Sequence, residues 1–314
     1  MDNFLSCDWG TSSFRIRLIR ADDIQVVAEV RTAQGVAATY KSWQQNGASD
    51  RQAFYTNVIQ QQVKVLEKQL DTSLEGIPIA LSGMASSSIG LIDLPYKPLP
   101  FKLDGSDLLI ESLIGSNPTT IISGACTYSD AMRGEETKAI GCAALLPDTE
   151  YDNILLMPGT HAKHISISGG MATGISSYMT GEFFELLAEK SVLAASVKSG
   201  SKLDEPMNWT SFMNGVKIGS AENLLHTAFT VRTNQVLKQH TGEQNYFYLS
   251  GLLLGTELAD VPKNVPVYLV SGEDHRALYQ LACEVLDIRV AGTIDADIAL
   301  IKGQHAVLRN LSVN

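Results

Sequence analysis

Two short turns, each built around a Gly-Thr pair, constrain the fold of this chain more than any other feature. Residues 8–13 read DWGTSS and lead into an alternating apolar segment, and residues 158–163 read PGTHAK between two apolar segments. Each pattern predicts a strand, a tight turn and a second strand. A glycine in such a turn lets the backbone approach a ligand, while hydroxyl and backbone N–H groups donate to phosphate oxygens. Two such hairpins, one in each half of the chain, predict duplicated halves that hold a nucleotide.

The charge of the chain argues against two classes of partner. Its 314 residues include 24 Lys and Arg against 34 Asp and Glu, which gives a formal net charge of −10. Nucleic acids and anionic membranes are bound by basic surfaces, so we expect neither as a partner. A small anionic ligand held by a few local donors stays compatible with this charge. The length fits one large domain or two moderate ones.

The cysteines and the N-terminal segment indicate a compartment. No Cys-x-x-Cys pair occurs, so we expect buried free thiols, as in a reducing cytoplasm. The cysteines are Cys7, Cys126, Cys142 and Cys283. The N-terminal segment lacks the basic and apolar regions of a signal peptide, and no segment approaches ~18 uninterrupted apolar residues. We therefore expect a cytoplasmic protein that does not cross a membrane.

The alternation of predicted strands and helices indicates an α/β fold. Strands are expected at about 4–7, 14–20, 26–32, 77–81, 120–123, 154–157, 165–167, 267–270 and 288–291. A capping box at 49–52 is expected to open a helix that runs to about 70. Further helices are expected from 135 and from 180 onward, at 208–220, 221–239 and 243–258, from 273 onward, and at 297–311. Within the apolar segment 243–258, Gly251 and Gly255 are four residues apart. This spacing indicates close packing against another helix.

Asp8 stands at the end of the first predicted strand, beside the first turn. A carboxylate there can hold a hydrated Mg²⁺, because this hard ion prefers oxygen ligands and keeps several waters. The alternative is an aspartate that only caps the turn. Arg15 is either a charged partner for a ligand or an outward-facing strand residue. The hydroxyl groups of Thr11, Ser12 and Ser13 either donate to phosphate or satisfy the turn backbone.

The second turn and a later strand end supply further candidates. Lys163 is either a point charge for phosphate or a solvated lysine, and His161 is either structural or catalytic. Ser271, Gly272 and Glu273 follow a predicted strand, at the carboxyl end where α/β sheets bind ligands. No His, Cys or Asp residues have the spacing of a metal site, so we expect no structural zinc.

A cluster of charged residues lies at the predicted start of the helix near residue 135. Glu135 and Glu136 complement the positive end of the helix dipole there. Arg133 opposes the same dipole, which indicates that its guanidinium has a partner. That partner is either one of the two glutamates or an anionic substrate.

Taken together, these segments resemble the actin-like ATPase and sugar-kinase superfamily and, within it, the 2-dehydro-3-deoxygalactonokinase family. The matching segments, in family order, are 8–15, 132–137 (MRGEET), 157–163 (MPGTHAK), 179–182 (MTGE) and 249–255 (LSGLLLG). The resemblance implies an α/β protein of two ribonuclease-H-like domains with an interdomain cleft. Residues 1–145 would form the sugar-side domain and residues 146–296 the nucleotide-side domain. The C-terminal helix, 297–314, would pack back on the first domain.

The resemblance also implies the reaction. The γ-phosphoryl group of ATP would pass to the C6 hydroxyl of 2-dehydro-3-deoxy-D-galactonate, with Asp8 holding Mg²⁺ through water. Glu136 is the first candidate for the base, followed by Glu135, and Arg133 would bind the substrate carboxylate or the transferring phosphoryl group. The ATP-binding residues implied are Gly10, Thr11, Ser12, Ser13, Gly159, Thr160, His161, Lys163, Ser271, Gly272 and Glu273. The substrate-binding residues implied are Arg15, Gly35, Gly83, Met84, Ser87 and Ser88.

The sequence departs from the family pattern in the sugar region. Ser86, Ser88 and Leu91 replace a glycine, an asparagine and a tryptophan that are usual in the family, and His164 stands where a tryptophan is common. Kinase activity is therefore better supported than the identity of the sugar acid. Two alternatives remain, a kinase for another sugar acid or sugar and a non-catalytic ATP-dependent sensor of the same fold. A homodimer also stays open.

Overall fold

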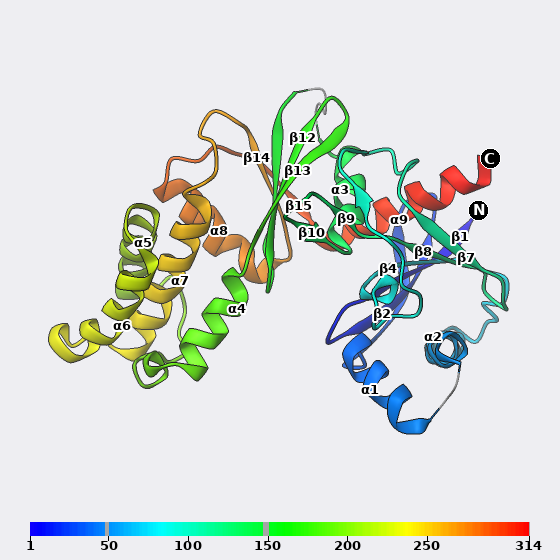
Figure 1. The fold of residues 1–314 in the computed structure, drawn as a ribbon, viewed down its shortest axis with the longest axis horizontal. Helices are drawn as coiled ribbons and strands as arrows, with labels where there is room; N and C mark the ends of the chain where they lie inside the picture. The colour runs from blue at the N-terminus through cyan, green and yellow to red at the C-terminus, as the bar shows by residue number, and fades with distance from the viewer. Residues whose placement is uncertain (48–49, 147–150, 314) are drawn as a thin grey trace. The chain divides into compact units, whose positions relative to one another are not determined.

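The computed structural model describes residues 1–47, 50–146 and 151–313. The chain divides into two compact units (Figure 1). The first comprises residues 1–151, 165–175 and 295–314, and the second comprises residues 152–164 and 176–294. Each unit contains strands and helices, so the predicted α/β architecture is confirmed.

The first sheet has six strands in the order β3-β2-β1-β4-β8-β7. β1 pairs antiparallel with β2 and parallel with β4, and β4 pairs parallel with β8. β1 is buried along most of its length, and its apolar face carries Leu5, Cys7 and Trp9. The strands are β1 (Asn3–Trp9), β2 (Phe14–Arg20), β3 (Gln25–Thr32), β4 (Ile79–Gly83), β7 (Ile110–Leu113) and β8 (Thr119–Ile122).

The second six-stranded sheet has the order β15-β14-β11-β12-β13-β6, in which all strands but the edge strand β6 repeat this arrangement. β11 takes the place of β1, with its hairpin strands on one side and the later strand β14 pairing parallel on the other. The duplication that the two turns predict is therefore present in the order of the strands. The strands are β6 (Phe101–Lys102), β11 (Asn153–Met157), β12 (Ala162–Ser168), β13 (Met171–Tyr178), β14 (Val267–Ser271) and β15 (Val290–Asp295). A small sheet joins β5 (Lys97–Pro98), β9 (Ala125–Cys126) and β10 (Ala131–Met132).

Helices cover both faces of the first sheet. One face of β1 packs against α2 through Leu5, Cys7 and Trp9, and the other face packs against α9 through Phe4 (Figure 1). The α2 residues that face the sheet recur at helical spacing, as the sequence predicts. The helices of this unit are α1 (Val36–Asn46), α2 (Arg51–Leu70), α3 (Glu135–Ala143) and α9 (Ala296–Val313). A short 3₁₀ turn spans Met84–Ser86.

The second unit carries a group of helices around α7. The structure starts α6 at Leu224 rather than near 221, because Asn223 caps it by accepting from the Leu225 N–H. The helices are α4 (Thr180–Glu185), α5 (Pro206–Ala221), α6 (Leu224–Lys238), α7 (Gly242–Leu258) and α8 (Glu273–Val285). A π-helical turn (Leu186–Lys190) and a 3₁₀ segment (Val192–Ser196) follow α4.

Two further predictions from the sequence bear on cysteines and membranes. All four cysteines are free; three are buried and Cys126 is half-buried. None of the helices in the described part of the chain combines the length and the hydropathy that a bilayer crossing requires.

Glycines set the distance between α5 and α7. A Cβ atom at Gly215, Gly219, Gly251 or Gly255 would lie only 2.0–2.3 Å from a backbone oxygen of the facing helix. No real Cβ contact is that short, so the two backbones touch where side chains are missing. The packing role expected for Gly251 and Gly255 is confirmed, and the helix that they face is α5.

Replacing Gly255 by alanine is expected to destabilise the fold. Its new methyl group would meet the Val216 carbonyl oxygen at 2.2 Å. Backbone atoms yield little, so we expect a loss of about 1–3 kcal/mol in the free energy of unfolding, despite the better helix propensity of alanine. Urea denaturation measures it. Gly115→Ala is the control, because its nearest neighbour would lie 3.9 Å away. Equal stability of the two variants would contradict this packing.

Candidate functional site

The first turn connects β1 to β2 and presents three hydroxyl groups. Its backbone closes through a hydrogen bond from the Gly10 N–H to the Ser13 carbonyl oxygen, 2.9 Å long. Thr11, Ser12 and Ser13 are all exposed. The hydroxyl groups are therefore accessible to a ligand, as a phosphate-binding turn requires.

Helix α1 lies directly against this turn. A Cβ atom at Gly35 would lie 2.3 Å from the Thr11 carbonyl oxygen, so no larger residue fits there. The next two N–H groups, of Val36 and Ala37, donate to the carbonyl oxygens of Gly10 (2.9 Å) and Thr11 (3.1 Å). Gly35, which the sequence assigns to the substrate side, thus supports the turn from behind.

The second turn, between β11 and β12, is supported in the same way by α4. A Cβ atom at Gly181 would lie 2.6 Å from the Gly159 carbonyl oxygen, and the Glu182 N–H donates to the Thr160 carbonyl oxygen at 3.0 Å. The Glu182 carboxylate also lies 2.6 Å from the His161 ring, which gives this histidine a structural partner. The MTGE segment is therefore part of the turn's support.

Lys163 is buried, with 5% of its surface exposed. Its ammonium group donates to the His161 carbonyl oxygen at 3.2 Å. The reading of Lys163 as a solvated surface lysine is wrong. Its charge instead lies beneath the second turn, where it stabilises the turn and adds positive potential to it.

Asp8 is half-buried, with 30% of its side chain accessible. Its carboxylate pairs with the Arg15 guanidinium at 3.2 Å, and Arg15 also binds Asp297 at 2.6 Å and 2.8 Å. Asp297 in turn binds Arg17 at 2.6 Å. Burial lowers the pKa of Arg15, but Asp8 and Asp297 outweigh it and the net pKa is raised. Burial likewise raises the pKa of Asp297, and the two arginines bring its net pKa below the usual value.

Arg133 is held by the loop that follows β4. Its guanidinium donates to the Ser86 carbonyl oxygen, to the Ser86 hydroxyl at 2.7 Å and to the Leu94 carbonyl oxygen at 3.4 Å. It also stacks on the ring of Tyr96, 4.1 Å from the ring centre. The backbone N–H of Arg133, rather than its guanidinium, donates to Glu135 at 3.0 Å. The sequence offers one of the two glutamates or an anionic substrate as the partner of this guanidinium, and the structure adds the loop after β4, which neither alternative includes.

The two neighbouring glutamates have different environments. Glu136 is fully buried, and its carboxyl accepts from the Gly134 N–H at 2.8 Å and from the Thr137 hydroxyl at 3.1 Å. Burial, with a smaller contribution from the charge of Glu135, raises the pKa of Glu136 to about 8. Glu135 is half-buried. In this conformation Glu136 presents no surface to a ligand, whereas Glu135 and Asp8 do.

The loop at the end of β4 carries the expected substrate residues. Gly83 is buried against β1, and a Cβ atom there would lie 3.5 Å from the Asp8 carboxylate. The Ser87 hydroxyl is used within the loop, where it donates to the Met84 carbonyl oxygen at 2.7 Å. Ser88 is exposed, and its carbonyl oxygen accepts from Arg51 at 2.7 Å. This loop and Asp8 therefore lie at the same edge of the first sheet.

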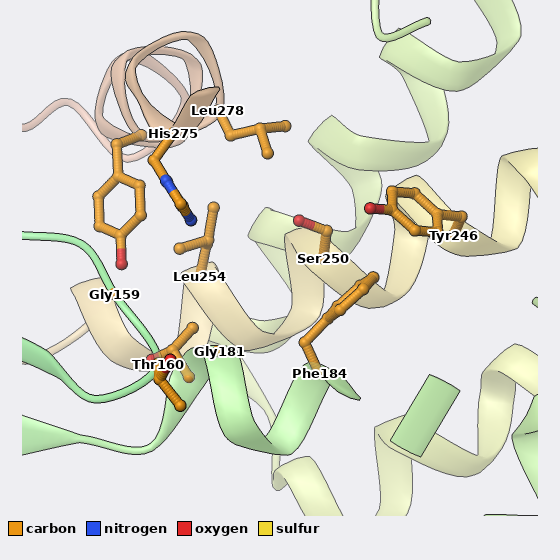
Figure 2. A pocket seen from close by; sticks show the side chains of 11 residues that line it. Gly159, Thr160, Gly181, Phe184, Tyr246, Ser250, Leu254, His275 and Leu278 are labelled. Carbon is orange, nitrogen blue, oxygen red and sulfur yellow. The ribbon is translucent and has the colours of Figure 1, made fainter. Parts of the chain in front are cut away.

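A pocket of about 450 Å³ opens beside the second turn (Figure 2). It is formed by the turn, by α4 and by the facing sides of α7 and α8. Its lining is aromatic and apolar with a few polar groups, which is typical of small-molecule sites. The lining residues are Gly159, Thr160, Thr180, Gly181, Phe184, Tyr246, Ser250, Leu254, His275, Leu278 and Tyr279.

Three residues that the resemblance assigns to ATP lie outside the lining of this pocket. Ser271, Gly272 and Glu273 do not line this pocket, and α8 begins at Glu273 and reaches it with His275 and later residues. The α7 residues of the pocket were not assigned to the ligand from the sequence, although Ser250 and Leu254 lie within the family segment 249–255. A second signal is the spacing of four residues from Tyr246 to Ser250 to Leu254, which places them on one face of a helix.

The donor groups fit a phosphorylated ligand. Each unit has a turn with exposed hydroxyls or backbone N–H groups, and Asp8 could hold a hydrated Mg²⁺ because one carboxylate suffices when the ion keeps its waters. No group of three or more His, Cys, Asp or Glu residues in the described part of the chain forms a direct metal site.

Comparison with known proteins gives a consistent result. A model of the family described as 2-keto-3-deoxy-galactonokinase matches residues 8–307. The chain is 29% identical over 294 residues to the 2-dehydro-3-deoxygalactonokinase of Escherichia coli K12, covering 90% of each chain. It is also 29% identical over 321 residues to a protein assigned the same activity in Rhizobium meliloti 1021, covering 98% of this chain and 96% of that one.

Solved structures agree on the fold. A crystal structure assigned as a 2-dehydro-3-deoxygalactonokinase protein of Sinorhizobium meliloti superposes with a TM-score of 0.83 at 26% identity, covering 98% of this chain and 99% of that one. The activator of 2-hydroxyisocaproyl-CoA dehydratase from Clostridium difficile, solved with bound ADPNP, gives a TM-score of 0.53 at 11% identity, with 99% and 96% covered. The two-domain actin-like fold that the sequence predicts is confirmed.

The raised pKa of Glu136 makes a prediction about stability. The folded-state pKa of Glu136, about 8, lies above the ordinary 4.5. The free energy of unfolding is therefore highest at low pH and falls as the pH rises above 4.5 and through 8, where the buried carboxyl loses its proton. Glu136→Gln removes this loss. We expect the variant to match the Tm of the unaltered chain near pH 4.5 and to exceed it at pH 9. Each kcal/mol of difference in the free energy of unfolding corresponds to about 2–4 °C in Tm.

Thermal unfolding across this pH range measures the effect. Glu75→Gln is the control, because Glu75 is exposed and should give parallel curves. A Tm difference that does not change with pH would contradict a raised pKa at Glu136.

Proposed function

Because this chain belongs to the 2-keto-3-deoxy-galactonokinase family, we propose that it transfers the γ-phosphoryl group of ATP to the C6 hydroxyl of 2-dehydro-3-deoxy-D-galactonate. The observation that carries this proposal is the family match, which runs from residue 8 to residue 307 and includes both turns. The enzyme is a sugar-acid kinase. We place the reaction in the cytoplasm, which is compatible with four free thiols.

Phosphoryl transfer requires positioned phosphates, neutralised charge and an oriented hydroxyl. The two turns supply the phosphate donors in this proposal, with Thr11, Ser12 and Ser13 from the first and Gly159 and Thr160 from the second. Bound Mg²⁺ would neutralise charge on the phosphate oxygens. The pocket beside the second turn takes the nucleoside, with the rings of Phe184 and Tyr246 available to contact the base.

The sugar acid is assigned to the loop at the end of β4 and to the start of α3. Arg133 is half-buried and is held by Ser86 and Tyr96, so its positioned guanidinium is our candidate for binding a substrate carboxylate. Ser86 is one of the residues that depart from the family pattern. The contact between Ser86 and Arg133 is therefore where a difference in acceptor preference would arise.

Asp8 is our candidate for the general base, whose carboxylate accepts the proton of the acceptor hydroxyl. A base must come within hydrogen-bond reach of its proton, and the buried Glu136 does not offer that contact in this conformation. Asp8 is accessible and keeps one oxygen beyond its pair with Arg15. Glu135 remains the next candidate, while Glu136 would stabilise the Gly134 backbone.

A kinase assay tests the function. We expect ADP formation to require a sugar acid and to be fastest with 2-dehydro-3-deoxy-D-galactonate, with its gluconate epimer as the comparison. ATP turnover that ignores the acceptor would favour the sensor instead. A clear preference for another acceptor would leave the enzyme a kinase and correct its substrate.

Asp8→Asn tests the assignment of Asp8 as the general base. The change keeps the size of the side chain and removes its charge, so we expect kcat to fall by at least ~10²-fold. Asp23→Asn is the matched control, because Asp23 pairs with Arg20 on the surface at the far end of the same hairpin. If Asp8→Asn kept a kcat near that of the control, Glu135 would become the base to test.

The Mg²⁺ dependence separates the two roles of Asp8. A residual activity that saturates at the same Mg²⁺ concentration as the unaltered enzyme identifies Asp8 as the base. A requirement for more Mg²⁺ identifies it as the group that holds the hydrated ion.

A further inference from the structure

A buried carboxylate lies behind the pocket of the second unit. Glu257, in the last turn of α7, is only 2% exposed. It accepts hydrogen bonds from His164 at 2.9 Å, from the Tyr279 hydroxyl at 3.0 Å and 2.9 Å, and from the Thr180 hydroxyl. The proposed reaction assigns no role to Glu257.

This carboxylate is well satisfied. One of its oxygens accepts from His164 and Tyr279, and the other accepts from Thr180 and Tyr279. Removing a carboxylate from water is costly, and such a group persists only where donors surround it. Burial, followed by the charge of Glu257, raises the pKa of Tyr279 well above its ordinary value. Tyr279 therefore stays protonated and remains a donor at neutral pH.

The donors come from three different elements around the pocket. Thr180 begins α4 and Tyr279 belongs to α8, and both residues line the pocket. Thr180 also precedes Gly181, which lies against the second turn (Figure 2). His164 lies on β12, the strand that leaves this turn. Glu257 thus joins its own helix to the three elements that shape the turn and the pocket walls.

We propose that Glu257 is a positioning residue for the adenine nucleotide. It fixes Thr180 and Tyr279 in the pocket wall and, through the start of α4, fixes the turn that binds phosphate. It does so without touching the nucleotide, because its own surface is covered. The inference rests on the proposed function, which assigns the nucleotide to this pocket.

Glu257→Gln tests the inference. The amide keeps the shape of the side chain but turns one acceptor into a donor that faces donating groups. We expect the Kd for ADP, measured by calorimetry without sugar acid, to rise about 10-fold through misplacement of the pocket wall. The KM for the sugar acid should stay within about 2-fold, since that substrate is assigned to the first unit. A uniform loss of folding would not split the two substrates in this way.

Three companion variants provide controls. Asp260→Asn removes a surface carboxylate that lies just after the end of α7 and accepts from the Tyr178 hydroxyl. This variant should bind ADP normally. Thr180→Val removes one hydroxyl that contacts Glu257 and should weaken ADP binding in the same direction. Thr180→Ser keeps that hydroxyl and should restore binding. This pair tests the contact even if Glu257→Gln fails to fold.

The outcomes distinguish this inference from the proposed function. ADP binding that is unchanged in both Glu257→Gln and Thr180→Val would overturn the inference alone. Equal losses for ADP and for the sugar acid would also overturn it, because they indicate general destabilisation. Failure of the unaltered chain to bind ADP would overturn the nucleotide assignment, and this inference with it.

Discussion

Both Gly-Thr turns keep their shape because the backbone of a following helix lies directly against them. Gly35 does this at the start of α1, and Gly181 does it in the first turn of α4. In each case an N–H group of the helix donates to a carbonyl oxygen of the turn. The carbonyl oxygens are thereby used on the rear side, which leaves hydroxyl and N–H groups on the other side for an anion. The other candidate residues of each unit are arranged around this contact.

The same physical device therefore serves two units with unrelated surroundings. In the first unit the turn lies next to a charged network in which Asp297 joins Arg15 and Arg17. In the second unit it lies above a buried carboxylate, Glu257, and beside an aromatic pocket. Charge near the first turn suits a polar acceptor and its reacting hydroxyl, and the apolar pocket suits a nucleoside. The proposed assignment of the acceptor to the first unit and of the nucleoside to the second follows from what packs around each turn.

Sequence reasoning found the features that local chemistry determines. The turns, the apolar strands and the long helices follow from glycine, hydroxyl and apolar spacing, and the resemblance rests on the same segments. It missed α1, whose sequence, VAATYKSWQQN, has few apolar residues and buries only Val36 and Thr39. It also missed Asp297, which meets Arg15 across 282 positions of the chain. Contacts of that separation leave no local pattern.

The two glutamates of α3 show most clearly what the sequence cannot predict. Glu135 and Glu136 are chemically alike and adjacent, so the sequence ranks them only by analogy. Their exposure depends on how α3 packs, and α3 packs chiefly on α9, from the opposite end of the chain. The pocket residues of α7 are hidden for a related reason. That helix is apolar nearly all round, and only its neighbours decide which side faces a cavity.

Helix α9 has a consequence for the order in which the chain matures. Its Gln304 donates to the Cys7 carbonyl oxygen and to the Ser82 hydroxyl, both at 2.9 Å, in the middle of the first sheet. The first sheet therefore emerges early from the ribosome but keeps an open face until the last helix has been made. The second unit has most of its residues in one continuous segment and needs no such wait. During synthesis the later unit can close first, and the exposed face of the earlier sheet is the surface that a chaperone would meet.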